Sequence, residues 1–259
     1  MSDEILYEVK DGVGRITFNR QQARNAFTFK MYERFSDIGR QAAADPSVKV
    51  LVLTGADENA FAAGTDISEF RKFSTPQDAL DYESRINGLL DAFERIPIPT
   101  IAAIAGPCTG GGFTIAACCD LRIAAANARL GVPIARTLGN CLSMANYVRL
   151  TALLGAARVK DILFTGRLVD ANEARAIGLL SEVLPDYVAL QARADELART
   201  IASRAPLTLR VTKDALRRIK EAMTPEENAN MILTCYMSND FREGLDAFLN
   251  KRTPKWTGT

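Results

Sequence analysis

The chain has 259 residues, of which 47% are hydrophobic and 24% are charged, so it can bury one sizeable core as an ordinary globular protein does. Its 32 Lys and Arg residues and 31 Asp and Glu residues give a formal net charge of +1, which argues against nucleic acid or an anionic membrane as the main partner. Histidine is absent, and this excludes Ser-His-Asp and Cys-His nucleophile systems and disfavours a catalytic zinc site.

No apolar run reaches the roughly 18 residues that a membrane-spanning helix needs, and the opening MSDEILYEVK does not resemble a signal peptide. The cysteines are odd in number and show no C-x-x-C spacing; they are Cys108, Cys118, Cys119, Cys141 and Cys235. We therefore expect reduced thiols in a cytoplasmic protein that binds no metal.

The first part of the chain alternates predicted strands and helices. Two strands, ILYEVK and GRITFN, are joined at the turn signal Asp11-Gly12, and the apolar spacing predicts a helix over residues 28 to 44. Continuous apolar runs predict strands that are covered on both faces at VKVLVLTG, TIAAIAG and DLRIAA. Residues 78 to 96 form a predicted helix that stops at PIP, and another helix begins in GGFTIAACC.

Helices dominate from about residue 138, apart from the strand-like SEVL, and Pro206 begins a C-terminal helical region that is expected to run past residue 250. Buried strands in alternation with helices predict an α/β fold. No internal repeat or low-complexity linker divides the chain. We expect a core over residues 1 to 200 and a C-terminal helical layer over residues 201 to 259.

Three consecutive glycines, Gly110 to Gly112, lie between a buried strand and a helix start. The segment AFAAGTDISEF follows another strand in the same way. A helix N-terminus carries unpaired N–H groups and a partial positive charge, so two such ends that converge would form an oxyanion hole made of backbone. The alternative is that the glycines only allow a helix to pack tightly on its strand. A phosphate loop and a dinucleotide fingerprint are both absent.

Several motifs together resemble the crotonase, or enoyl-CoA hydratase/isomerase, superfamily. They are ITFNRQQARNAFT near the start, FAAGTDISEF (61–70), IAAIAGPCTGGGFTIAACCDLRIAA (101–125), FTGRLVDANEARAIGLLSEVLP (164–185) and FLNKRTPKWTG near the end. The resemblance implies a spiral of ββα turns with a C-terminal helical trimerisation region. It also implies a homotrimer or a dimer of trimers, and an acyl-CoA substrate whose coenzyme A takes the place of any separate cofactor.

The resemblance assigns the backbone N–H groups of Thr65 and Gly111 to the thioester oxygen. The residues that fall where the family lines its coenzyme A site are Arg24, Ala26, Ala63, Asp66 and Ile67. Alternatively, Arg24 is a solvated charged residue on the surface that takes no part in binding. Asp66 is better explained as a helix cap, which Glu69 would complete as a capping box.

Lys251 or Lys255 of a neighbouring subunit would meet the phosphates of coenzyme A. Alternatively, either lysine is a freely solvated tail residue.

The hydratases of the superfamily add water with two glutamates. In this chain the first of those positions is Thr114, and the second falls at about Ile134. Neither side chain moves a proton as a glutamate does, and such groups typically contribute ~10²–10⁴-fold in rate. The replacement of both glutamates should therefore severely reduce the activity of an ordinary two-glutamate hydratase.

Other side chains remain as candidates for the chemistry. Glu83 is the preferred side-chain base, ahead of Glu69. Asn140 either binds a distal carboxylate or hydroxyl of the substrate or, as we prefer, caps a helix. Cys141 is expected to fill core space rather than to act as a nucleophile.

The leading hypothesis is an enzyme that stabilises a thioester enolate in decarboxylation, isomerisation or hydrolysis. The alternative is an acyl-CoA binder or structural subunit without catalysis, since both glutamates are missing.

Overall fold

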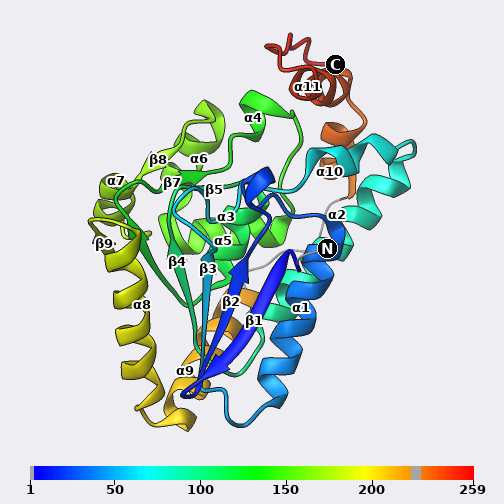
Figure 1. Cartoon of the computed structure of the whole chain (residues 1–259). Helices are drawn as coiled ribbons and strands as arrows, with labels where there is room; N and C mark the ends of the chain where they lie inside the picture. The colour runs from blue at the N-terminus through cyan, green and yellow to red at the C-terminus, as the bar shows by residue number, and fades with distance from the viewer. Residues whose placement is uncertain (1–2, 223–228) are drawn as a thin grey trace.

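The computed structural model describes residues 3–222 and 229–259 and is shown in Figure 1. Its strands are β1 Ile5–Lys10, β2 Val13–Phe18, β3 Val50–Gly55, β4 Thr100–Ile104, β5 Pro107–Thr109, β6 Leu121–Ala125, β7 Arg129–Gly131, β8 Val169–Asp170 and β9 Glu182–Leu184. Its helices are α1 Phe29–Ala44, α2 Pro76–Glu94, α3 Gly111–Cys118, α4 Ile134–Thr137, α5 Met144–Leu154, α6 Ala156–Thr165, α7 Ala171–Ala176, α8 Tyr187–Ala202, α9 Pro206–Ala222, α10 Ala229–Tyr236 and α11 Asn239–Leu249, with 3₁₀ turns η1 Gln21–Ala23 and η2 Ile67–Lys72.

The main sheet begins with the predicted hairpin. β1 and β2 pair antiparallel with Tyr7 opposite Ile16, and the turn holds Asp11 and Gly12 at φ 52° and 80°. Positive φ at both central residues is the geometry that an Asp-Gly pair favours in a two-residue hairpin. The remaining strands pair in parallel, and the order across the sheet is β1-β2-β3-β4-β6-β9.

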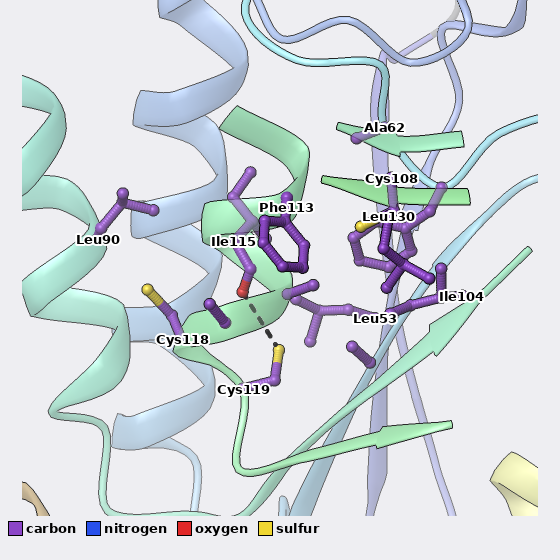
Figure 2. Packing of buried hydrophobic residues seen from close by; sticks show 14 of the residues in the cluster. Leu53, Ala62, Leu90, Ile104, Cys108, Phe113, Ile115, Cys118, Cys119 and Leu130 are labelled. Atoms are coloured by element: carbon purple, nitrogen blue, oxygen red, sulfur yellow. Dashed lines mark hydrogen bonds between the residues drawn. The ribbon is translucent and has the colours of Figure 1, made fainter. Parts of the chain in front are cut away.

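Alternate residues of β3 reach two different cores. Leu51 and Leu53 pack in the larger cluster, and Figure 2 shows Leu53 on the side of the sheet where Phe113 of α3 lies. Val50 and Val52 face the other way, into a cluster that includes residues of α8, the long helix that covers the opposite face of the sheet in Figure 1. This confirms a strand buried on both faces, as its continuous apolar run predicted.

A small second sheet was not predicted. Its order is β5-β7-β8, with Cys108 opposite Leu130 in the parallel pair β5 and β7. Strands of two or three residues are too short to carry an alternating pattern. This sheet matters for the site because β5 leads directly into the three glycines and α3.

Two elements differ in detail from the prediction. Helix α11 ends at Leu249, so the expectation of helix past residue 250 is wrong. The segment after Asp66 is the 3₁₀ turn η2; Asp66 caps it through the Ser68 amide, but among the described residues Glu69 makes no reciprocal capping bond. Within residues 3–222 and 229–259, no helix is both long and apolar enough to cross a bilayer.

Candidate functional site

Two loops that follow β3 and β4 are held against each other. The Thr109 amide donates to the Ala62 carbonyl at 3.0 Å, and Ala62 bridges Cys108 of β5. A side chain on Gly112 would place its Cβ 2.2 Å from the Ala62 carbonyl oxygen. Gly64 and Gly110 both have positive φ, 101° and 51°, a region that side chains other than glycine's rarely adopt.

The loops bring two main-chain amides together. An ideal Cβ on Gly111 would lie 3.4 Å from the Thr65 nitrogen, so the two residues lie beside each other. Gly111 is the first residue of α3, where an amide has no acceptor within the helix. Among the described residues, neither the Thr65 amide nor the Gly111 amide donates to a backbone or side-chain acceptor.

A cavity of about 690 Å³ opens beside these amides. Most of the residues that the sequence analysis considered for the site line it, although Glu69 and Lys255 do not; those that do are Thr65, Gly111, Thr114, Ile134, Glu83, Asn140, Arg24, Ala26, Ala63, Asp66 and Ile67. They come from the two loops and η2, from α2, α3 and α4, from the segment between α4 and α5, and from the segment that follows η1. The structure thus brings the predicted residues to one place, while their individual roles stay predictions.

A relay of hydroxyl groups lies next to the amides. The Thr65 hydroxyl is 2.9 Å from the Tyr32 hydroxyl and 3.3 Å from that of Tyr82. Burial raises the pKa of both tyrosines, so both remain protonated at neutral pH. Sequence analysis missed Tyr32 because its position on α1 has the spacing of a core residue, and nothing in the sequence connects it with Thr65.

The two positions where glutamates would be expected carry no acid or base. Thr114 is buried, and its Oγ1 donates to the Gly111 carbonyl at 2.8 Å, so its proton is held by the helix backbone. Ile134 begins α4 directly after Pro133. Neither side chain can exchange a proton with a ligand in the cavity.

The carboxyl group of Glu83 belongs to a second hydrogen-bonded group of side chains. Tyr236 of α10 donates to Glu83 Oε1 at 2.5 Å, and Asn140 Nδ2 donates to the Tyr236 hydroxyl at 3.1 Å. Burial and then the neighbouring Glu83 charge raise the pKa of Tyr236, which keeps its hydroxyl protonated. Tyr236 was missed because an aromatic residue in a helix reads as core, and it lies far from Glu83 in sequence.

The prediction that Asn140 caps a helix is wrong. Ser143 caps α5, accepting from the Asn146 amide. Both residue types favour N-cap positions, and the sequence did not reveal that the helix begins after the second of them. Cys141 is buried in an apolar cluster, as expected of a core residue, and it also lines the cavity.

Exposed cationic side chains and one hydrogen-bonded carboxyl group lie at the cavity wall. Arg24 and Lys251 are exposed and line the cavity from within one chain, whereas the prediction drew a lysine from a neighbouring subunit. Lys255 does not line it; the Lys255 amide donates to Glu243. Although burial opposes ionisation of Asp66, hydrogen bonds from Ser68 and Arg20 hold the pKa of that carboxyl below its usual value, which agrees with the capping role.

A sequence model of the enoyl-CoA hydratase/isomerase family matches residues 8–259. The chain belongs to this family. It is 35% identical over 266 residues to the putative enoyl-CoA hydratase/isomerase YngF of Bacillus subtilis, covering 100% of both chains. It is 33% identical over 260 residues to a short-chain-enoyl-CoA hydratase of Clostridium acetobutylicum, covering 96% of both.

Solved structures of the enoyl-CoA hydratase/isomerase family share the fold. An enoyl-CoA hydratase/carnithine racemase from Magnetospirillum magneticum superposes with a TM-score of 0.81 at 33% identity, covering 100% of this chain and 97% of that one. A methylmalonyl-CoA decarboxylase in complex with 2-nitronate-propionyl-CoA superposes with a TM-score of 0.91 at 27% identity, covering 99% of both chains. The α/β architecture is therefore the crotonase fold, as the resemblance implied, and the family supports an enzyme that acts on an acyl-CoA.

Proposed function

We propose that this crotonase enzyme stabilises the enolate of an acyl-CoA thioester with the amides of Thr65 and Gly111, in a reaction other than two-glutamate hydration. Family membership supports the acyl-CoA substrate. The observation that carries the mechanism is that Gly111 lies beside the Thr65 amide and that neither of the two amides has an acceptor among the described residues. As charge develops on the thioester oxygen, both N–H groups donate to it. Removing one such donor typically costs roughly 2.7–4 kcal/mol of transition-state stabilisation.

Decarboxylation is the reaction that asks least of this cavity. The bond from Cα to a carboxylate breaks, its electron pair moves into the enolate, CO₂ leaves, and Cα then takes a proton from water, which leaves hydroxide to the solvent. No protein base is needed, which suits a site with Thr114 and Ile134 at the glutamate positions. The likeness to the methylmalonyl-CoA decarboxylase structure is a further support.

The charge distribution of the cavity also favours loss of a carboxylate. Among the described residues that line it, the cationic side chains are Arg24 and Lys251, and both are exposed. A carboxylate placed inward of them meets apolar groups, hydroxyl groups and the acidic side chain of Glu83, none of which neutralises its charge. Poor solvation raises the free energy of the localised carboxylate more than that of a transition state with dispersed charge.

Isomerisation is the second candidate, and Glu83 favours it. This buried carboxyl group lines the cavity and could carry a proton from one carbon of the acyl chain to another. Decarboxylation needs no such carrier, so the two candidates make different demands on Glu83.

The test removes one amide while leaving the shape of the loop. Gly111 is the first helical residue of α3, a position where proline is tolerated, but a Cβ there meets the Tyr32 hydroxyl. The variant Gly111→Pro with Tyr32→Phe therefore loses the N–H, and Gly111→Ala with Tyr32→Phe is the matched control that keeps it. Turnover is measured as CO₂ release from methylmalonyl-CoA and as Cα deuterium in the propionyl-CoA that this reaction forms in D₂O.

We expect the proline variant to lose roughly 10²–10³-fold in kcat relative to the alanine control. Equal rates in the two variants would remove the Gly111 amide from the mechanism. Tight acyl-CoA binding by the unmodified protein without deuteration or product would instead support the alternative, a binder without catalysis.

A further inference from the structure

Two thiols that lie far apart in the sequence meet beside the cavity. Cys141 lies in the segment between α4 and α5 and lines the cavity, whereas Cys235 belongs to α10. Both are free cysteines in the same apolar cluster, and the Cys141 side chain forms a hydrogen bond with that of Cys235. No C-x-x-C spacing indicates this pair, because only tertiary packing brings the two residues together.

A second contact places the Cys141 sulfur at the same turn of α10. Cys141 Sγ donates to the Met231 carbonyl oxygen at 3.7 Å, and Met231 lies one helical turn before Cys235. Side chains on a helix point back toward its N-terminus and cover the turn that precedes them. The Cys235 side chain therefore covers the turn that Cys141 reaches, and the two sulfur atoms need only a small movement to form a disulfide.

The two cysteines differ in the way that a two-step oxidation requires. Cys235 is partly exposed, while Cys141 is buried. The hydrogen bond from Cys141 lowers the pKa of Cys235 to about 7, so a large fraction of Cys235 is thiolate near neutral pH, and the thiolate is the nucleophile. A partly exposed thiolate beside a second thiol is the arrangement of a redox-sensing cysteine and its resolving partner.

The other cysteines lack this arrangement. Cys108, Cys118 and Cys119 are buried, and burial raises the pKa of each thiol. The sulfur atoms of Cys108 and Cys119 donate to the carbonyl groups of Gly112 and Ile115 at 3.6 Å, and Figure 2 shows both cysteines among apolar side chains. These thiols are therefore protonated and shielded from a dissolved oxidant.

We propose that Cys141 and Cys235 form a redox modification site, at which a hydroperoxide converts the two thiols to a reversible disulfide. The Cys235 thiolate attacks one peroxide oxygen, the O–O bond breaks, and Cys235 becomes a sulfenic acid while the other oxygen leaves as hydroxide and is protonated to water. The Cys141 sulfur then attacks the Cys235 sulfur, the S–O bond breaks, and the departing hydroxide takes the Cys141 proton to form a second water. The two sulfur atoms together lose two electrons, which reduce the peroxide.

The new bond would join the cavity wall to α10. Cys141 lines the cavity, and its neighbour Asn140 already contacts α10, because Asn140 Nδ2 donates to the Tyr236 hydroxyl at 3.1 Å. Disulfides of this kind in reducing compartments are transient and act in redox sensing. The inference does not rest on the proposed function, because neither the bond nor its detection involves an acyl-CoA.

Oxidation of the whole folded chain by hydrogen peroxide tests the proposal. The reduced protein is treated with a small excess of peroxide near neutral pH, denatured in N-ethylmaleimide, and examined by intact mass and by peptide mapping. Of the five thiols, we expect two to escape alkylation and to appear as one pair of peptides joined through Cys141 and Cys235. Dithiothreitol should make all five available for alkylation again.

Three variants locate the chemistry. In Cys141→Ala, Cys235 lacks its partner, so peroxide should carry it past the sulfenic acid to a sulfinic acid, which dithiothreitol does not reverse. In Cys235→Ala, the buried Cys141 should remain available for alkylation. Cys119→Ala is the matched control: it removes a buried cysteine outside the pair, and the linked peptides should form as they do in the unmodified chain.

The unmodified chain decides the matter even if a variant does not fold. Five alkylated thiols after peroxide treatment overturn the inference, and so does a disulfide that joins other cysteines or links Cys235 of two copies. Cys235 that reaches the sulfinic acid in the unmodified chain while Cys141 stays available for alkylation also overturns it, because the second thiol would then not resolve the first. Joined Cys141 and Cys235 peptides that dithiothreitol separates support it.

Discussion

The Tyr32 hydroxyl occupies the space that a side chain on Gly111 would need: an ideal Cβ on Gly111 would lie 2.1 Å from it. The three glycines therefore serve different purposes. Gly110 supplies a positive φ, Gly112 allows contact with the Ala62 carbonyl, and Gly111 makes room for a tyrosine. Tight packing and open access to the backbone, the two explanations that the sequence left open, thus go together at the same loop.

This contact predicts a rescue. Gly111→Ala should lower the free energy of unfolding by about 1–3 kcal/mol, because the added methyl group overpacks the site. Tyr32→Phe should remove the larger part of that cost, since the Tyr32 hydroxyl oxygen is the closest atom, and the Thr65 Oγ1, at 2.9 Å, accounts for the remainder. Urea unfolding of both single variants and the double variant gives the coupling energy. Additive effects of the two changes would contradict the contact.

Thr114 should be dispensable for turnover. Its hydroxyl donates to a helix carbonyl, so Thr114→Ala is expected to stay within about tenfold of the normal kcat and to lose about 1 kcal/mol of stability with the hydrogen bond. Steady-state kinetics and thermal unfolding are measured on the same preparation. A folded variant with less than about a hundredth of normal turnover would show that Thr114 takes part in the chemistry.

Glu83→Gln separates the two candidate reactions. Glutamine keeps an oxygen that accepts from Tyr236, but it cannot carry a proton. If decarboxylation is the reaction, CO₂ release should remain within about tenfold. If Glu83 moves protons along the acyl chain, isomerisation followed by NMR should fall by ~10²–10⁴-fold. Tyr236→Phe serves as the complementary control, because it removes the hydrogen bond that Glu83→Gln keeps and leaves the carboxyl group.

Cys235 should be the reactive thiol. A hydrogen bond from Cys141 lowers the pKa of Cys235 to about 7, so the thiolate predominates above that pH and is lost as the pH falls below it. We expect alkylation by iodoacetamide to rise through pH 7 and level off, followed by mass spectrometry. Cys141→Ala should move the midpoint toward that of a free thiol. An unchanged midpoint in this variant would exclude the hydrogen bond as the cause.

The buried cysteines give the internal comparison for that experiment. Burial raises the pKa of Cys108, Cys118 and Cys119, and each is nearly or fully shielded from solvent. They should remain unlabelled in the folded protein across the same pH range. Labelling of all three together with Cys235 would indicate unfolding rather than a selectively reactive thiol.

We expect the chain to assemble through α9. This helix buries none of its residues, and Leu207 and Val211 are 72% and 65% exposed, an unfavourable arrangement for apolar side chains unless another surface covers them. Light scattering should give a mass well above 28.3 kDa. Leu207→Glu with Val211→Glu should reduce it, whereas Val188→Glu on α8, 77% exposed, is the matched control. A monomer at micromolar concentration would contradict the expectation.

The sequence predicted most of what local pattern determines. The hairpin at Asp11-Gly12 and the doubly covered β3 followed from turn chemistry and from a continuous apolar run. The partnership of Glu83 with Tyr236 did not, because a contact between α2 and α10 depends on tertiary packing and leaves no periodic trace. The cap of α5 was misplaced because Asn140 and Ser143 are both good cap residues, and only the path of the chain decides between them.

The cavity draws Arg24 from one part of the chain and Lys251 from a segment close to the other end. Its wall is therefore unfinished until nearly all of the described chain has been synthesised, even though the sheet strands around β3 are already available. A nascent chain still missing α11 would have a hydrophobic interior but an incomplete binding site. A ligand that occupies this cavity would thus stabilise the fold only once the segment after α11 is in place.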